Sequence, residues 1–446
     1  MICHFSLILI SMSQLQYTKG EYNRLGDRIR QSPDSISTDD LTMLQTLRLS
    51  YKNLLSAVFN ILVEESKKID KRVAIPTYRV KRIESIVSKL QREPKMQLSR
   101  MSDIAGCRCI LQSNDKVYAL KKRLEERLCV KHINDYISAP KSNGYKSLHL
   151  IVSLSENDSK TIEIQLRCLQ DHNWATLVEI TDLVYGTRIK ELGSDGELAE
   201  FHRLLSYAYD PTLSIEQKVR IVNIANAHSY FKRISEIFSK NYIEVRNKWN
   251  ASKQSKNNFY LISTDSSGSP EIASFKTFES AEKAYFETYL DNPGNRNIVL
   301  THIKDASFDS ISLAYSNYFL TYNALLVRCY QMMSDIVVLY YHAGKLVKFT
   351  NLYNQFLELT THILGVHLAD YVEFQNKVFT VKSINKRAEW ANSIRGHLNS
   401  IIGVLQITYH KTPFRWKCLA CSIVKSLLHR NFVRQQISPY KTENKK

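Results

Sequence analysis

Hydrophobic residues in the N-terminal part of the chain recur at helical spacing. Between residues 40 and 68, apolar side chains stand three or four positions apart, which predicts a helix with one buried face. The same spacing returns after Pro76 and predicts a second helix over 79–92. The polar side of this second helix carries three cations and a serine on one face: Arg82, Ser85, Lys89 and Arg92.

Short apolar runs take over beyond residue 100, and they fit strands. The candidate strands are GCRCIL at 106–111, HINDYI at 132–137, SLHLIVSL at 147–154 and TIEIQLRC at 161–168. Helical patterns lie between and after them, at 114–128 and 169–185. Strands that alternate with helices are typical of an α/β or α+β domain of the catalytic type.

A change of composition divides the chain. Residues 198–250 are polar with a helical pattern, and ASKQSKNN at 251–258 indicates a linker. Strand-like and helical runs then alternate up to Phe319, and the pattern from Thr321 onward is mostly helical. The sequence thus predicts four parts: an N-terminal segment 1–40, a domain 41–250, a small α/β module 259–319 and a basic helical region 321–446.

Positive charge dominates the chain. The formal net charge is +18, from 61 Lys and Arg against 43 Asp and Glu, which favours polyanionic partners such as nucleotides, RNA or acidic membrane surfaces. Residues 376–446 hold 14 of these cations against two acids. Such a stretch fits a polyanion-binding region and a solvated basic face equally well.

Cysteine usage and hydropathy bound the cellular context. Eight scattered cysteines argue against a secreted disulfide scaffold and favour the reducing cytoplasm. The apolar opening MICHFSLILISMS lacks a basic flank and is too short to span a bilayer, so we expect neither a signal peptide nor stable membrane insertion. Whether translation starts at Met1 or Met12 stays open.

Charged and polar side chains share one face of the run TIEIQLRC. Because strand side chains alternate, Glu163, Gln165 and Arg167 point away from the apolar residues between them. Taken alone, this pattern is more typical of a half-exposed strand than of a site. A second carboxylate, Asp103, stands just before the strand at 106–111. Two carboxylates from neighbouring strands are the usual protein share of a magnesium site on a nucleoside triphosphate.

The stretch YISAPKSNGYKSLH at 136–149 combines a bend with groups that bind nucleotides. Pro140 and the pair Asn143-Gly144 favour a turn before the following strand. Two lysines and a histidine offer cationic groups for phosphates, and an aromatic ring offers a flat face for a base. We therefore expect a nucleotide site in this loop.

Four blocks, in order, resemble the synthetase domain of the RelA/SpoT family, whose members make the alarmones pppGpp and ppGpp. They span residues 79–179 and read RVKRIESIVSKLQR, DIAGCR, PKSNGYKSLHL and EIQLRCLQDHNWATLVE. Cys168 departs from the threonine that is frequent in the family. The resemblance implies a synthetase-only member with an α+β fold, in which a mixed-sheet, nucleotidyltransferase-like domain is flanked by helices.

The resemblance also implies roles for residues of this chain. Asp103 and Glu163 would be the catalytic residues and would hold Mg²⁺. The ATP site would comprise an adenine pair and three phosphate ligands, namely Arg79 and Arg108, then Lys81, Lys89 and Arg92. Tyr145 would stack on the guanine of the acceptor. The other acceptor contacts would come from Asn143, Lys146, His149, Gln165 and Arg167.

The implied reaction is the transfer of pyrophosphate from ATP to the 3′-hydroxyl of GTP or GDP, with AMP as leaving group. Two alternatives stay open. In the first, the same donor site modifies the 3′ end of tRNA and halts translation, as toxin-like relatives do, and the basic C-terminal region favours contact with tRNA or the ribosome. In the second, the chain is a non-catalytic RNA-binding regulator. Homo-oligomerisation is compatible with all three.

Overall fold

The structure, a computed structural model, describes residues 17–71, 73–192, 196–252, 257–264, 270–291, 298–304 and 306–319, together with seven single residues between 325 and 336. The chain forms two compact units. The first comprises Met1–Ser206 and Glu244–Asn323, and the second comprises Tyr207–Ile243 and Ala324–Lys446. Apart from the seven single residues, the predicted helical region 321–446 lies outside the described residues, and so does its basic stretch 376–446.

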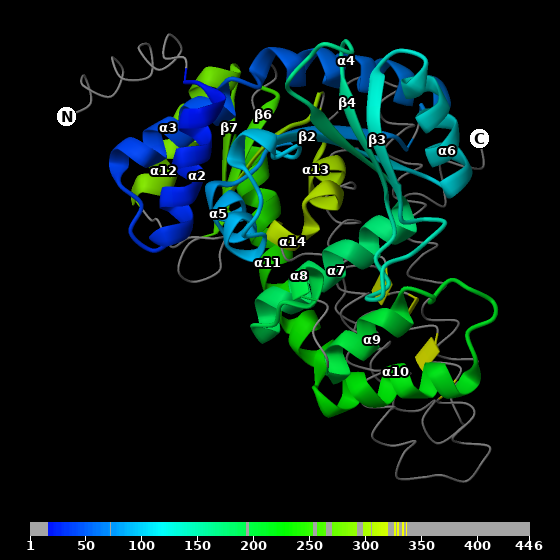
Figure 1. The fold of residues 1–446 in the computed structure, drawn as a ribbon. Helices are drawn as coiled ribbons and strands as arrows, with labels where there is room; N and C mark the ends of the chain where they lie inside the picture. The colour runs from blue at the N-terminus through cyan, green and yellow to red at the C-terminus, as the bar shows by residue number, and fades with distance from the viewer. Residues whose placement is uncertain are drawn as a thin grey trace, which may run out of the picture. The chain divides into compact units, whose positions relative to one another are not determined.

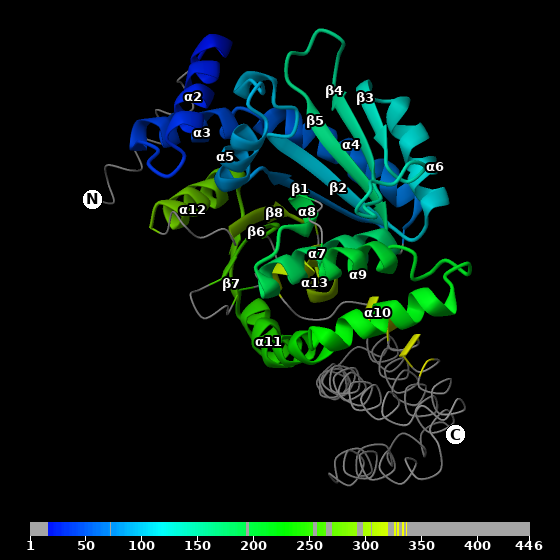
Figure 2. The ribbon, with the colours of Figure 1, turned by 60° about the horizontal axis from the view of Figure 1, so that its bottom comes forward.

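A mixed sheet of eight strands forms the centre of the first unit (Figures 1 and 2). Its spatial order is β3-β4-β5-β2-β1-β8-β6-β7. β2 and β5 run parallel, and the other neighbouring pairs are antiparallel. The strands are β1 Ile75–Val80, β2 Ala105–Leu111, β3 Cys129–Asp135, β4 Leu148–Ser153, β5 Ile162–Cys168, β6 Phe259–Thr264, β7 Pro270–Phe275 and β8 Ile298–His302. This sheet with its flanking helices confirms the predicted α+β fold class.

Helices cover both faces of the sheet (Figure 2). α4, α6 and α12 belong to the larger hydrophobic core on one face, whereas α13 and residues of α11 belong to a second core on the other. The helices are α2 Lys19–Gln31, α3 Thr38–Leu49, α4 Lys52–Ile69, α5 Ile83–Arg92, α6 Asn114–Glu125, α7 Leu169–Tyr185, α8 Ile189–Leu192, α9 Glu197–Leu205, α10 Ile215–Ala227, α11 Tyr230–Ser252, α12 Phe278–Asp291, α13 Phe308–Ala314 and α14 Ser316–Phe319. None of these described helices combines the length and the apolar composition that crossing a bilayer requires.

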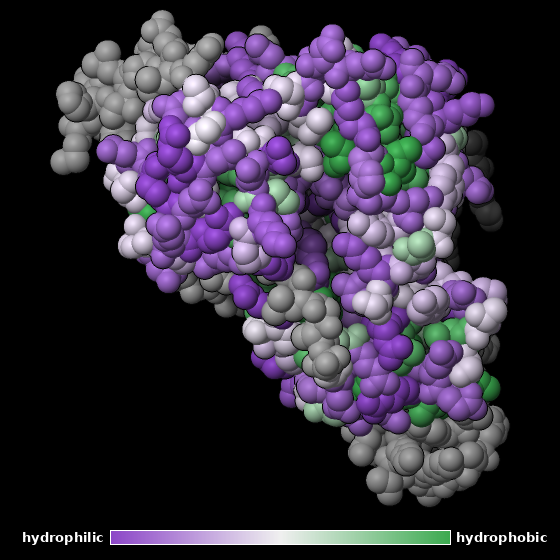
Figure 3. Space-filling view, viewed as in Figure 1, coloured by the Kyte–Doolittle hydropathy of each residue, from purple (hydrophilic) through white to green (hydrophobic). Residues whose placement is uncertain are grey.

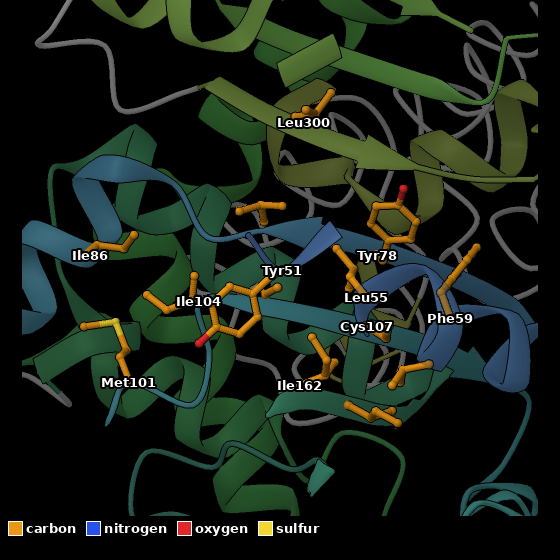
Figure 4. Close-up of a cluster of buried hydrophobic side chains, with 14 of the residues drawn as sticks. Tyr51, Leu55, Phe59, Tyr78, Ile86, Met101, Ile104, Cys107, Ile162 and Leu300 are labelled. Atoms are coloured by element: carbon orange, nitrogen blue, oxygen red, sulfur yellow. The ribbon is translucent and has the colours of Figure 1, made fainter. Parts of the chain in front are cut away.

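The larger core forms from alternate residues of the strands. Tyr78 on β1, Cys107 on β2 and Ile162 on β5 belong to one cluster with Leu55 and Phe59 of α4 (Figure 4). All five side chains are at most 6% exposed. Burying an apolar side chain of this size contributes about 1.5–3 kcal/mol. Because successive strand residues point to opposite faces, the residues between these core positions face away from α4.

The helix predicted over 40–68 is two helices, α3 and α4. The break falls at Ser50 and Tyr51, where the Ser50 hydroxyl donates to the Leu47 carbonyl at 2.6 Å. Both helices bury leucines against the same core, so their hydrophobic spacing continues across the break. Because the spacing continues, hydrophobic periodicity alone cannot reveal the break between the two helices.

The helix predicted over 79–92 is wrong at its start. Residues 75–80 form strand β1, and helix α5 begins only at Ile83. Val80 on the strand and Ile83 on the helix are both buried in one core, at 3% and 0% exposure. The two elements therefore imitate a single helical stripe. Arg79 stands on the strand, and Lys81 lies in the link to α5.

The separate module predicted at 259–319 instead belongs to the sheet. β8 pairs with β1, with Thr301 opposite Arg79, and β6 and β7 follow beside it. A fully buried ion pair at 3.0 Å joins Arg48 of α3 to Glu282 of α12. Pairing between segments more than 200 residues apart leaves no local pattern, so a sequence reading cannot find it.

Candidate active site

Polar side chains of three neighbouring strands converge on the face of the sheet opposite α4. In the register, Gly106 on β2 lies between Arg79 on β1 and Glu163 on β5. Arg108, two residues further along β2, lies beside Gln165. A Cβ on residue 106 would stand 3.0 Å from the Glu163 carbonyl oxygen, so only glycine lets these strands approach without adjustment.

These residues line a pocket of about 80 Å³. Its walls are Thr77, Arg79, Lys81, Asp103, Gly106, Cys107, Arg108, Glu163, Gln165 and Tyr315. On the face seen in Figure 3, a hydrophilic recess opens between the surfaces over α5 and α7. Sites that enclose a whole small molecule typically measure about 300–1,000 Å³. The pocket is therefore smaller than a site that would enclose a whole nucleotide-sized ligand.

Two lysines hold Asp103. Lys81 Nζ lies 2.7 Å from one carboxylate oxygen and Lys89 Nζ lies 3.0 Å from the other. The turn from β1 into α5 brings the two lysines to the same carboxylate. Burial on its own raises the pKa of Asp103, but the two ammonium groups outweigh it, and the pKa lies below its usual value. The carboxylate is therefore ionised at neutral pH.

Glu163 is held by a histidine and an amide. His149 Nδ1 lies 2.9 Å from one oxygen, and Gln165 Nε2 donates to the other at 2.8 Å. Burial raises the pKa of Glu163, but His149 and Gln165 outweigh burial and lower the pKa to about 2. The pKa of His149 rises in return, because Tyr145 and Glu163 outweigh the opposing effect of burial.

A closed ring of hydrogen bonds continues from this pair. The Tyr145 hydroxyl lies 2.8 Å from His149 Nε2 and accepts a bond from Arg167 Nη2 at 2.5 Å. Arg167 also donates to Gln165 Oε1 at 3.3 Å, and the hydrogen bond from Gln165 to Glu163 closes the ring. Burial raises the pKa of Tyr145, but Arg167 and His149 outweigh it and lower the pKa to about 7. The ring fixes all five side chains relative to one another.

Aromatic and cationic groups surround the Tyr145 ring. The ring is 9% exposed and meets Tyr136 edge-on at a centroid distance of 6.0 Å. Lys141 Nζ lies 4.5 Å from the Tyr136 centroid and 5.4 Å from that of Tyr145. Asn143 Oδ1 accepts a hydrogen bond from the Tyr145 backbone at 3.0 Å and so shapes the turn. The loop is thus built around Tyr145.

Arg79 and Arg108 both line the pocket. Among the described residues, the buried Arg108 Nε atom has no hydrogen-bond partner. Burial and the neighbouring Arg167 and Arg79 lower the pKa of Arg108 to about 10. Glu179 on α7 is the nearby counter-charge. Burial raises the pKa of Glu179, but Lys190 and the two pocket arginines outweigh it and lower the pKa to about 2.

Seven of the predicted site residues lie outside the pocket lining, and three of these seven belong neither to the lysine pair at Asp103 nor to the hydrogen-bonded ring. Arg92 stands at the end of α5 with a side chain 40% exposed, near Glu93. Lys146 donates to the Ser206 carbonyl at 3.0 Å, and Asn143 serves the turn. The other predicted residues either line the pocket or join it through Asp103 and the hydrogen-bonded ring.

Four residues at the site were given no role from the sequence: Thr77, Tyr136, Glu179 and Tyr315. Lys141 is one of the two loop lysines expected to offer a cation for phosphates, and Tyr136 opens the same loop, so the composition of the loop could have found this tyrosine. Glu179 is the last residue of the fourth family block, so the resemblance marks its segment. Thr77 and Tyr315 lie outside the four blocks, and their local sequence gives no signal.

The two carboxylates of the pocket suit a magnesium ion. Asp103 and Glu163 line the same pocket, and both are ionised because their pKa values are lowered. Mg²⁺ prefers oxygen ligands and usually takes one or two carboxylates, with waters and substrate phosphates completing its coordination. Among the described residues, no group of three or more His, Cys, Asp or Glu side chains that could hold a metal ion occurs.

Comparison with known proteins relates this chain to a family. The sequence model described as "Region found in RelA / SpoT proteins" matches residues 78–189. The GTP pyrophosphokinase YwaC of Bacillus subtilis is 32% identical over 188 residues, which cover 38% of this chain and 89% of that protein. The chain belongs to the RelA/SpoT family. This confirms the resemblance carried by the four sequence blocks.

Other members of the RelA/SpoT family are similar over shorter stretches. The GTP pyrophosphokinase YjbM of Bacillus subtilis is 35% identical over 124 residues, which cover 26% of this chain and 59% of that protein. The crystal structure of small alarmone synthetase 2 from Bacillus subtilis is 29% identical and aligns with a TM-score of 0.29 over 35% of this chain and 86% of that chain. The matched range 78–189 contains every predicted site residue, whereas β6 to α14 lie beyond it.

Proposed function

We propose that the chain transfers a pyrophosphoryl group from ATP to the 3′-hydroxyl of GTP or GDP, with Mg²⁺ as cofactor, and so makes pppGpp or ppGpp in the cytoplasm. The observation that carries this proposal is one pocket that unites Asp103 and Glu163 with Arg79, Lys81 and Arg108. Transfer of phosphoryl-type groups needs in-line positioning and charge neutralisation more than covalent catalysis. The relatives named GTP pyrophosphokinase support the same reaction class.

On the donor side, the pocket provides contacts for both ends of ATP. Arg79 and Arg108 have planar guanidinium groups, which suit an adenine ring, and Arg108 Nε has no hydrogen-bond partner among the described residues. Bound at Asp103 and Glu163, Mg²⁺ supplies neutralisation of phosphate charge. Lys81 and Lys89 are the nearest ammonium groups and stabilise the charge that develops on the leaving AMP. Arg92, further along α5, meets the phosphates at the outer edge.

On the acceptor side, the hydrogen-bonded ring positions the nucleotide. Tyr145 contacts the guanine, and Lys146, His149, Gln165 and Arg167 supply donors nearby, with Asn143 holding the turn. His149 and Gln165 already bind the two oxygens of Glu163, and a carboxylate that also holds a cation is a weakened base, so Glu163 is poorly suited to remove the proton of the attacking hydroxyl. We therefore assign positioning and charge neutralisation, and not proton abstraction, as its main work.

The proposed reaction is tested by following the label of γ-labelled ATP to its acceptor. The full chain is incubated with Mg²⁺ and γ-labelled ATP, together with GTP, GDP or deacylated tRNA. We expect label on the guanine nucleotide and expect Asp103→Asn and Glu163→Gln each to lower the rate about 100-fold or more. Asp135→Asn is the matched control, because this carboxylate is bound by Tyr118 and by its own turn and does not line the pocket. Rates that survive both pocket substitutions would refute the assignment.

Modification of tRNA is the second candidate function. The net charge of residues 376–446 favours it, because 14 cations against two acids suit a phosphate backbone. Label on tRNA would establish this function in place of alarmone synthesis. No transfer to any acceptor, with the chain folded, would favour a non-catalytic RNA-binding regulator.

A further inference from the structure

The segment that follows β8 reaches the pocket from outside the family-matched range. α13 lies against β1, and α14 lies against α7 and β6, on the face of the sheet opposite α4. Tyr315, between these two short helices, lines the pocket together with Arg79 and Arg108. The family match ends at residue 189, so this wall is a feature of the present chain beyond the matched region.

Tyr315 is held in a fixed position. Its side chain is 2% exposed, and its hydroxyl lies 2.5 Å from Thr301 Oγ1 on β8. Thr301 Oγ1 donates its own hydrogen to the Tyr78 carbonyl at 3.2 Å, so the tyrosine hydroxyl is the donor in the first bond. Thr301 pairs with Arg79 in the sheet, which sets the tyrosine and the arginine in one register.

The backbone just before Tyr315 is fixed as well. His172 Nε2 on α7 donates to the Leu313 carbonyl at 2.8 Å, and Arg108 Nη1 lies 3.4 Å from the Ala314 carbonyl. The segment is therefore attached to α7, to β2 and, through Thr301, to β8. Such attachment describes a wall of the pocket and not a lid that swings over it.

We propose that Tyr315 is a third contact for the donor base, so that a segment beyond the family-matched region helps to set the affinity for ATP. The inference rests on the proposed function. Two guanidinium groups and one aromatic ring line the same pocket, and the buried Arg108 Nε has no hydrogen-bond partner among the described residues. Aromatic rings bind bases through stacking worth about 1–3 kcal/mol. A purine is the part of ATP that such a set recognises.

Four substitutions in the full chain test this inference. Tyr315→Leu keeps apolar bulk but removes the ring, Tyr315→Phe keeps the ring but removes the bond to Thr301, and Tyr315→Ala removes both. Tyr260→Ala is the control, because Tyr260 is a buried tyrosine of the same core that does not line the pocket. The measured quantities are the dissociation constant of α,β-methylene-ATP by calorimetry, the KM values for ATP and GTP, and the thermal midpoint.

We expect Tyr315→Leu to weaken ATP-analogue binding and to raise KM for ATP about tenfold, with KM for GTP unchanged. Tyr315→Phe should stay within about twofold of the wild type. Unchanged analogue binding in Tyr315→Leu would overturn the contact. Tighter binding would overturn it too, because the ring would then occupy space that ATP needs. If the wild-type chain binds the analogue but transfers no label, the proposed function is contradicted. The contact between Tyr315 and the donor base can still be measured in that case by analogue binding.

Discussion

Gly144 shows how one backbone angle shapes the acceptor loop. Its φ is +92°, where residues with a Cβ are strained, and a Cβ there would stand 2.6 Å from Ser206 Oγ. We predict that Gly144→Ala lowers the free energy of unfolding by about 2 kcal/mol or more and raises KM for the guanine nucleotide about tenfold, because Tyr145 is the next residue. Chemical denaturation and initial rates measure the two effects.

Gly186 provides the matched control for this substitution. It also has a positive φ, +65°, but nothing lies within 4 Å of the added Cβ. Gly186→Ala should therefore cost only the backbone strain, about 1 kcal/mol, and leave KM unchanged. Equal costs for the two alanines would mean that the contact with Ser206 is unimportant.

Tyr145 leads to a spectroscopic prediction. Its pKa is lowered to about 7, whereas burial raises the pKa of Tyr51 to about 12. We predict that one of the 25 tyrosines forms phenolate near neutral pH in an ultraviolet difference titration and that Tyr145→Phe abolishes this early step. An unchanged titration curve in that variant would rule out Tyr145 as its origin.

The lowered pKa of Tyr145 also makes the free energy of unfolding depend on pH. A lowered pKa means that ionisation of Tyr145 favours the folded chain. Its stabilising contribution is absent below about pH 7 and grows as the pH rises to about 10, the usual pKa of tyrosine. Unfolding free energies of the wild type and of Tyr145→Phe should diverge over this interval, with the wild type gaining.

At the residue scale, the sequence identified side chains better than it identified their partners. Asp103 and Glu163 stand in short patterns whose chemistry is local, so both could be found. The ring through Tyr145, His149 and Arg167 depends on how β4 and β5 pair, which no local pattern contains. Tyr315 could not be found, because it reaches the pocket only through a distant strand.

At the scale of elements, α12 is fixed by charge inside the core. Arg48 and Glu282 are both fully buried, and Gln45 and the Lys81 carbonyl satisfy further bonding groups of the pair. We predict that Glu282→Gln lowers the free energy of unfolding by about 3–5 kcal/mol, because it leaves the Arg48 charge buried without its partner. Denaturant unfolding at neutral pH measures the loss.

A surface pair on the same helix is the control. Glu279 of α12 pairs with Lys52 of α4, and both side chains are more than 40% exposed. Glu279→Gln should cost at most about 1 kcal/mol. If the two glutamines cost the same, the buried pair does not hold α12 in place.

The bounds of an element were predicted well where a single helix or strand contributes all the buried residues of its segment. The pattern found α7 at its observed bounds, because this helix buries a continuous set of residues. It failed at 79–92, where a strand and a helix bury residues at compatible intervals. Periodicity shows which residues are buried. Burial alone does not distinguish a short strand that leads into a helix from one continuous helix.

At the scale of the whole molecule, the sheet is the unit to test. β8 pairs with β1 and β6, so we predict that β8 amides exchange hydrogen with an opening free energy within about 1 kcal/mol of those on β2. Glu282→Gln should lower protection in both groups together. Faster exchange confined to β6, β7 and β8 would instead support the separate module that the sequence suggested.

The position of β8 also bears on solubility. An unpaired strand edge is a template for pairing with another chain, and β1 without β8 would expose such an edge beside Arg79 and Lys81. Among the described strands the free edges are β3 and β7, and β7 begins with Pro270, which cannot donate to a ladder. Association of copies along the sheet would therefore begin at β3 or β7, and the strands that carry the pocket would stay out of it.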